Sequence, residues 1–148
     1  MIVNDIKMAN GSMYSYGLNH PTPPTSQFLV DVSNLRDPVG QAHLRDLTGR
    51  HSAVQDFVNA DPRLPALIDL VIMTLNDLCP PGTLVQPWIS VGFMDHHGVL
   101  LAPAVLEIVS KEIEHRMPSY DFIVRHYGLE LPVDYRPRKL ETFGGRVL

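Results

Sequence analysis

The sequence predicts a single α/β domain built on a mixed or parallel β-sheet with flanking helices. Apolar residues make up 45% of the 148 residues and charged residues 19%, values typical of one globular domain. The compact apolar segment at residues 88–92 has the composition of a strand that is covered on both faces. A helical pattern and a further strand-like segment follow it, and together the three predict a βαβ unit.

The first half of the chain alternates strand and helix patterns. Residues 13–16 alternate aromatic and smaller side chains, and residues 28–32 are mostly apolar, so both segments predict strands. The proline-rich residues 20–25 between them predict an extended loop. Residues 53–59 predict a short helix, with Ser52 as its N-cap.

The second half completes the sheet. A longer helix is predicted over residues 65–78, because Pro65 suits a first turn and apolar residues recur at helical spacing. Strands are predicted near residues 86–92 and 121–126, separated by a polar loop and by a helix over residues 103–115 that Pro103 opens. We expect Trp88 and Phe93 to lie in the core or at its edge.

Charge and cysteine content argue against several classes of protein. The net charge of −4 disfavours a dedicated nucleic-acid binder, although residues 134–148 carry +2 and the rest of the chain −6. The single cysteine, Cys79, excludes a disulfide framework or a cysteine zinc cluster. The sequence has neither an apolar run approaching the roughly 18 residues of a membrane span nor a signal peptide. We therefore expect a cytoplasmic protein.

Four segments stand in an order and spacing that resembles a known family. They are residues 14–17, 29–32, 43–58 and 125–126. They are similar, in that order, to an opening aromatic strand, an Asp-Val-Arg strand, an Arg-x-(Leu/Met)-Thr-Gly element leading into a helix, and a terminal basic pair. This combination resembles the C-terminal domain of the RNase adaptor protein RapZ family. The resemblance implies an α/β domain over residues 1–131, followed by an irregular basic tail over residues 132–148.

The family's functional loop is degenerate in this chain. The family has Gly-Cys-x-Gly-Gly-x-His-Arg-Ser between a buried strand and a helix, a pattern that presents backbone amides and an arginine to a phosphate. Within residues 92–99 only Gly92 and His97 match, while the glycine pair, the arginine and the serine are absent. Asp95 places an acid where a phosphate would lie, and Ser33 replaces the arginine of the Asp-Val-Arg strand.

The resemblance also indicates function. It implies binding of a small regulatory RNA, its presentation to an endoribonuclease, sensing of an amino-sugar phosphate, and self-association into a homo-oligomer. The sequence contains no Walker loop, and similar stand-alone domains occur in bacteria and their viruses. We predict a non-catalytic binding or adaptor domain without a cofactor that acts through a protein partner, for instance a phage protein acting on a host factor. An RNA- or phosphometabolite-binding regulator is the alternative.

The two kinds of partner, a protein and an RNA or phosphorylated ligand, would contact different residues. RNA or a phosphorylated ligand would contact Gly92, His97, Arg125, His126, Arg36, Arg45, Arg50, Arg136, Arg138 and Lys139. A protein partner would contact Phe93, Val99 and Leu100. Residues 99–102 are expected to be buried as the lead into a helix, whereas their exposure would mark a partner site.

A second resemblance gives a third hypothesis. Asp95, His96 and His97 resemble the Asp-His-His motif of manganese-dependent phosphoesterases, in which such groups bind metal. That family needs further Asp and His motifs upstream, and here His20 and Asp31 are isolated. We therefore predict no bound metal and no catalysis, and keep the phosphoesterase as the second alternative.

Overall fold

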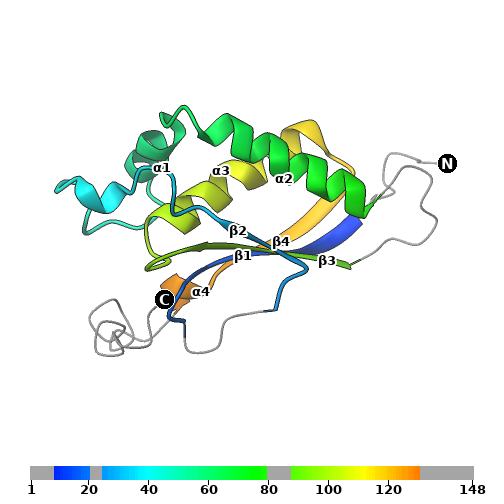
Figure 1. The fold of residues 1–148 in the computed structure, drawn as a ribbon, viewed down its shortest axis with the longest axis horizontal. Coiled ribbons are helices and arrows are strands. Elements are labelled where there is room, and N and C mark those ends of the chain that lie inside the picture. Colours follow the sequence, from blue (N-terminus) through cyan, green and yellow to red (C-terminus); the bar gives the residue numbers. More distant parts are fainter. Residues whose placement is uncertain (1–8, 21–24, 80–87, 131–148) are drawn as a thin grey trace.

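The computed structural model describes residues 9–20, 25–79 and 88–130, which form two layers (Figure 1). Four strands make an all-parallel sheet in the order β2-β3-β1-β4. They are β1 (Ala9–Gly17), β2 (Phe28–Asp31), β3 (Trp88–Asp95) and β4 (Tyr120–His126). The predicted α/β fold class is confirmed. The sequence predicted a mixed or a parallel sheet, and the sheet is parallel.

The helices are divided unequally between the two faces of the sheet. The long helices α1 (Ser52–Asn59), α2 (Leu64–Leu78) and α3 (Leu101–Arg116) cover one face, and the single turn α4 (Tyr127–Glu130) lies on the other (Figure 1). The crossovers from β2 to β3 and from β3 to β4 run in the same direction across the sheet. Because such crossovers are right-handed, their helices fall on the same face.

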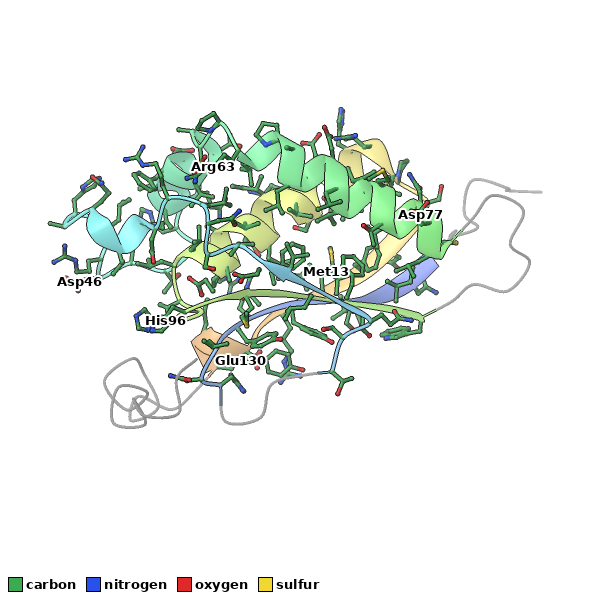
Figure 2. The ribbon with its side chains drawn as sticks, viewed as in Figure 1. Met13, Asp46, Arg63, Asp77, His96 and Glu130 are labelled. Carbon is green, nitrogen blue, oxygen red and sulfur yellow. The ribbon has the colours of Figure 1, made fainter. Side chains whose placement is uncertain are left out.

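The core lies between the sheet and these three helices. Met13 of β1 and Phe93 of β3 point into it and are at most 1% exposed; Met13 is labelled in Figure 2. Helix α3 contributes eight buried residues, among them Leu106 and Val109. This packing fixes the start of α3 against the carboxyl end of β3, which is where the candidate site lies.

Two predictions about helix starts are wrong. The N-cap of α1 is His51, whose Nδ1 accepts a hydrogen bond from the Ala53 amide at 3.1 Å, and Ser52 is the first helical residue. A histidine ring nitrogen can fill the role usually given to a hydroxyl or carboxylate. Helix α3 begins at Leu101 and not at Pro103. Proline is tolerated within a first turn because amides there have no partner inside the helix.

Two predictions for β3 also need correction. The strand continues to Asp95, so residues 93–95, expected in the loop, extend the sheet. Trp88, expected in or at the core, is 55% exposed, because its position in the strand points it to the face opposite the long helices. Phe93 is fully buried, as predicted.

The two ends of the predicted domain lie largely outside the described residues. These include the proposed boundary at residue 131 and the basic tail with Arg136, Arg138 and Lys139. The last described residues form a helical turn, α4, directly after β4. Within the described ranges, no helix has the length and apolar character needed to cross a membrane.

Candidate functional site

A hollow of about 260 Å³ opens at the carboxyl edge of the sheet, beside the start of α3. Open α/β sheets bind ligands at this edge, where the loops that follow the strands meet. The residues that line the hollow are Asp37, Val39, Arg45, Asp95, His97, Val99 and Leu100. They come from the loop after β2 and the loop after β3, so this hollow is the candidate functional site.

Asp95 is the last residue of β3 and is only 5% exposed. Its Oδ1 accepts a hydrogen bond from the Gly98 amide at 2.5 Å, and its carboxyl group also accepts one from the Ala102 amide in the first turn of α3. A helix N-terminus with free amides is a natural position for an anion. The chain therefore puts its own carboxyl group where an anionic ligand of this loop would bind.

The surroundings of Asp95 disfavour its charged form. Burial raises its pKa to about 7, and the nearby Asp37 carboxylate acts in the same direction. The hydrogen bonds from Gly98 and Ala102 oppose this shift only in part. Among the described residues no cation forms an ion pair with Asp95. Near neutral pH, the site thus contains a carboxyl group that exchanges between its acid and its charged form.

The loop that contains these groups is held closely against β1. Gly98 has a φ of +72°, and a Cβ at that position would lie 2.2 Å from the Gly17 nitrogen. The Leu18 amide also donates to the Asp95 carbonyl at 2.9 Å. The position therefore requires glycine, since a side chain would meet both backbone strain and a steric clash.

The two histidines of the loop differ in exposure. His96 is exposed and projects outward at this end of the molecule (Figure 2), while His97 is half-buried and lines the hollow. Their rings meet edge to face, with centroids 4.6 Å apart. The described ranges contain no group of three His, Cys, Asp or Glu residues able to hold a metal ion. Asp95 faces the loop amides, so the three residues of the phosphoesterase alternative are not arranged around one point.

The segment leading into α3 is buried, as predicted. Residues 100–102 are at most 6% exposed, and Val99 is half-buried in the wall of the hollow. Of the three residues expected to contact a protein partner, Phe93 and Leu100 lie in the core and offer a partner almost no surface. Gly92 packs on the other face of the sheet, where a Cβ would lie 3.2 Å from the Tyr16 ring, so it does not line the hollow.

The basic residues expected to bind RNA or phosphate are scattered. The Arg36 guanidinium lies 4.8 Å from the centre of the Phe57 ring, and Arg125 donates from Nε to both carboxylate oxygens of Glu130 at 2.9 Å. Neither arginine lines the hollow. Arg45 does, and its Nε donates to the Val39 carbonyl at 2.9 Å. Arg50 is exposed on the surface.

His126, expected to contact a ligand, instead joins a buried polar chain. Its Nδ1 lies 2.7 Å from Ser15 Oγ, and its Nε2 lies 2.7 Å from Glu107 Oε2. Ser15 is completely buried, so its hydroxyl has no access to a substrate, and the chain of groups ties β1, β4 and α3 together. Sequence analysis missed Ser15 and Glu107. The available signal was the position of Ser15 two residues after the apolar Met13, which places a polar side chain on the core face of the strand.

The structure is an all-parallel α/β domain whose candidate site lies at the loop between a buried strand and a helix N-terminus. Residues 10–87 match the family described as the RapZ C-terminal domain. The match covers more than half of the chain, and the chain belongs to this family. It ends before β3 and the loop at residues 92–99, the part whose sequence departs from the family pattern.

Relatives support the same assignment. A nucleotide-binding protein of Cereibacter sphaeroides is 31% identical over 123 residues, which cover 80% of this chain and 39% of that protein. One from Shewanella halifaxensis is 38% identical over 68 residues, which cover 43% of this chain and 24% of that protein. One from Synechococcus sp. is 42% identical over 53 residues, which cover 36% of this chain and 16% of that protein. The chain thus spans well under half the length of these relatives.

Proposed function

We propose that this chain is a non-catalytic binding domain whose phosphate position is filled by its own Asp95 and which acts through a protein partner. The observation that carries the proposal is the carboxyl group of Asp95 on the amides of Gly98 and Ala102. A phosphate would have to displace that group and then lie beside it. Asp37, which faces the same hollow, adds further repulsion.

The size of the penalty favours loss of phosphate binding. A helix N-terminus stabilises an anion by about 0.3–2 kcal/mol, and each hydrogen bond from a charged arginine adds about 1.5–3 kcal/mol. Here the amides are already used and the family's arginine is absent from the loop. Loss of several kcal/mol corresponds to about a thousandfold or more in affinity.

The proposal of a non-catalytic role rests on the buried groups. Ser15, His126 and Glu107 follow the order of a serine-hydrolase relay, but Ser15 is fully buried. A nucleophile must reach its substrate, which this hydroxyl cannot do without a large opening of the sheet.

A specific observation favours the alternative, an RNA- or phosphometabolite-binding regulator. Arg45 and His97 both line the hollow, and Arg45 would bring positive charge to a phosphate if Asp95 were protonated. The relatives are named nucleotide-binding proteins, although this chain spans only part of their length. The two proposals differ in one measurable quantity, the affinity of the hollow for a phosphosugar.

Calorimetry with glucosamine-6-phosphate at pH 8 separates them. The unaltered chain should release no binding heat up to millimolar ligand. Asp95→Ser, which removes the charge and shortens the side chain, should gain at least tenfold in affinity, whereas the matched control Asp46→Ser, on an exposed loop residue, should not. No gain in Asp95→Ser would show that Asp95 does not close the site. Micromolar binding by the unaltered chain, lost in His97→Ala, would establish the phosphometabolite alternative.

RNA binding is tested separately by gel shifts at two salt concentrations. Any binding should depend on the tail, weaken as salt rises, and fall when Arg136, Arg138 and Lys139 are changed to alanine. RNA binding that is unaffected by these changes but lost in Arg45→Ala would favour the hollow as the RNA site.

A further inference from the structure

The charges that line the hollow at the start of α3 do not balance. Asp37, Arg45 and Asp95 line it, and Asp95 is only 5% exposed. With Asp95 ionised and the His97 ring neutral, two negative charges and one positive charge face the hollow, a net charge of −1. A negative charge in a partly enclosed site repels a phosphate and attracts a cation.

The arginine does not neutralise either acid by direct contact. Arg45 Nε donates to the Val39 carbonyl at 2.9 Å, and among the described residues no ion pair joins Arg45 to Asp37 or to Asp95. The two acids also repel each other, because the Asp37 carboxylate raises the pKa of Asp95 in addition to the larger effect of burial. The hollow therefore has two carboxyl groups that a cation from outside could pair.

Another part of the chain shows how a buried acid is stabilised by a cation. Asp61 is also almost fully buried, and its Oδ2 lies 2.9 Å from Nη2 of Arg63. Asp95 forms no ion pair within the described ranges. A buried charge is costly unless it is paired. A cation supplied by a ligand would therefore take the place at Asp95 that Arg63 takes at Asp61.

The walls of the hollow favour one kind of cation. Val39, Val99 and Leu100 line it beside the acids, and its volume is about 260 Å³. A lysine side chain combines an apolar four-carbon stem with a compact ammonium group that has three donors. The stem fits against the apolar walls while the ammonium reaches two separate carboxylates. The flat fork of an arginine suits a single carboxylate that it binds with two parallel bonds.

We propose that the hollow receives a lysine side chain of a protein partner, whose ammonium group binds between the carboxylates of Asp37 and Asp95. This inference rests on the proposed function, because it names the group with which a protein partner would enter the site. Asp37 Oδ1 accepts a hydrogen bond from the Val39 amide at 2.9 Å, which holds the carboxylate in position and leaves Oδ2 for the ammonium. One ammonium group brings the charge of the lining to zero.

The first test uses N-acetyl-lysine N-methylamide as the probe. It is titrated into the full chain at pH 8, above the pKa of about 7 of Asp95, and the amide NMR signals of Gly98 and Ala102 are followed because these amides donate to Asp95. We expect saturable shifts. The norleucine analogue has the same stem without the ammonium and should bind at least about tenfold more weakly. Equal binding of the two probes, or no saturable shift with the lysine probe, would overturn the proposal.

Two substitutions with opposite expected effects test the charges. Asp37→Asn keeps an acceptor for the Val39 amide but removes a negative charge, so the dissociation constant of the lysine probe should rise about tenfold. Arg45→Gln removes the positive charge and should lower that constant. The matched control is Asp77→Asn, an exposed acid at the opposite end of the molecule from His96 (Figure 2), which should change nothing. Weaker binding in Arg45→Gln, or equal effects of Asp37→Asn and Asp77→Asn, would contradict the proposal.

Calorimetry with glucosamine-6-phosphate separates failure of this inference from failure of the proposed function. If neither the phosphosugar nor the lysine probe binds, the lysine contact is wrong, and a partner that covers the hollow in another way still agrees with the proposed function. If the phosphosugar binds at micromolar concentration, both are wrong, because the hollow is then a site for anions.

Discussion

Asp61 and Asp95 are two almost fully buried carboxyl groups, 2% and 5% exposed, that the fold treats in opposite ways. Asp61 follows α1 and accepts four hydrogen bonds: from the Arg36 amide at 2.8 Å, and from the amide, Nε and Nη2 of Arg63 at 3.0, 3.1 and 2.9 Å. Asp95 accepts only backbone amides and lies near a second acid, Asp37.

The difference appears in their acidities. Hydrogen bonds from the Arg63 side chain lower the pKa of Asp61 well below its usual range, despite burial. Burial dominates at Asp95 and raises its pKa to about 7. A nearby cation therefore makes a buried carboxylate a structural anchor, whereas its absence leaves a group that titrates near neutral pH. The anchor holds the start of α2, and the titrating group lies at the candidate site.

The largest expected effect comes from removing the anchor. Asp61→Ala leaves the Arg36 and Arg63 amides without their acceptor and should lower the free energy of unfolding by about 3 kcal/mol at pH 7. Urea denaturation measures it. The control Asp69→Ala, which breaks the exposed pair with Arg116, should cost under about 1 kcal/mol. Equal losses in the two variants would show that burial of Asp61 does not distinguish it from a surface acid.

The pH dependence of Asp61 has a definite sign. Because its folded pKa lies below the unfolded value of 3.8, its contribution is present above that value and is lost as the pH falls through the lower folded pKa. The difference in stability between the unaltered chain and Asp61→Ala should therefore shrink only under acid conditions.

The contribution of Asp95 to stability should change with pH in the opposite direction to that of Asp61, and over a different pH range. Its folded pKa of about 7 lies above the unfolded value of 3.8, so the native state holds the proton longer as the pH rises. Stability should fall between those two values, by at most about 1.4 kcal/mol per pH unit, and level off above them. Urea titrations at pH 5, 6, 7 and 8 should show this slope in the unaltered chain relative to Asp95→Asn. Parallel curves for the two proteins would contradict the assignment.

How far the sequence reveals these two acids depends on the range of their contacts. Proline and a helix-ending pattern correctly mark the end of α1 before Asp61 and Pro62, because these signals are local. The hydrogen bond from the Arg36 amide to Asp61 joins residues 25 positions apart, which no local pattern encodes. The acid at the helix N-terminus was visible as a departure from a family motif, although its burial and its contact with Ala102 required the fold.

The range of the contacts also explains which helices, strands and side-chain positions could be predicted from the sequence. The three long helices and the strands β2, β3 and β4 were predicted to within a few residues from periodicity and proline positions. Strand β1 was predicted only over residues 13–16 and runs from Ala9 to Gly17. Trp88 was misplaced because aromatic character alone does not tell which face of a strand a side chain occupies. The Ser15, His126 and Glu107 contacts bring together β1, β4 and α3, and only the parallel register of β1 with β4 makes them.

The smallest expected change in the free energy of unfolding comes from a third acid, Glu107. Its side chain is 25% exposed and its Oε2 lies 2.7 Å from His126 Nε2, so its surroundings are intermediate between those of Asp61 and those of Asp95. Glu107→Gln keeps an acceptor for an N–H on His126 and removes only the charge, so the free energy of unfolding should fall by about 1 kcal/mol or less. The control Glu114→Gln, an exposed position on the same helix, should change nothing measurable by urea denaturation at pH 7.

A loss of about 3 kcal/mol in Glu107→Gln would instead mean that His126 is held as a cation, because removing one partner of a buried ion pair leaves the other charge uncompensated. Glu107 would then act as a structural anchor, like Asp61. The property that separates the anchors from Asp95 would be a cationic partner of any kind, and not an arginine partner in particular.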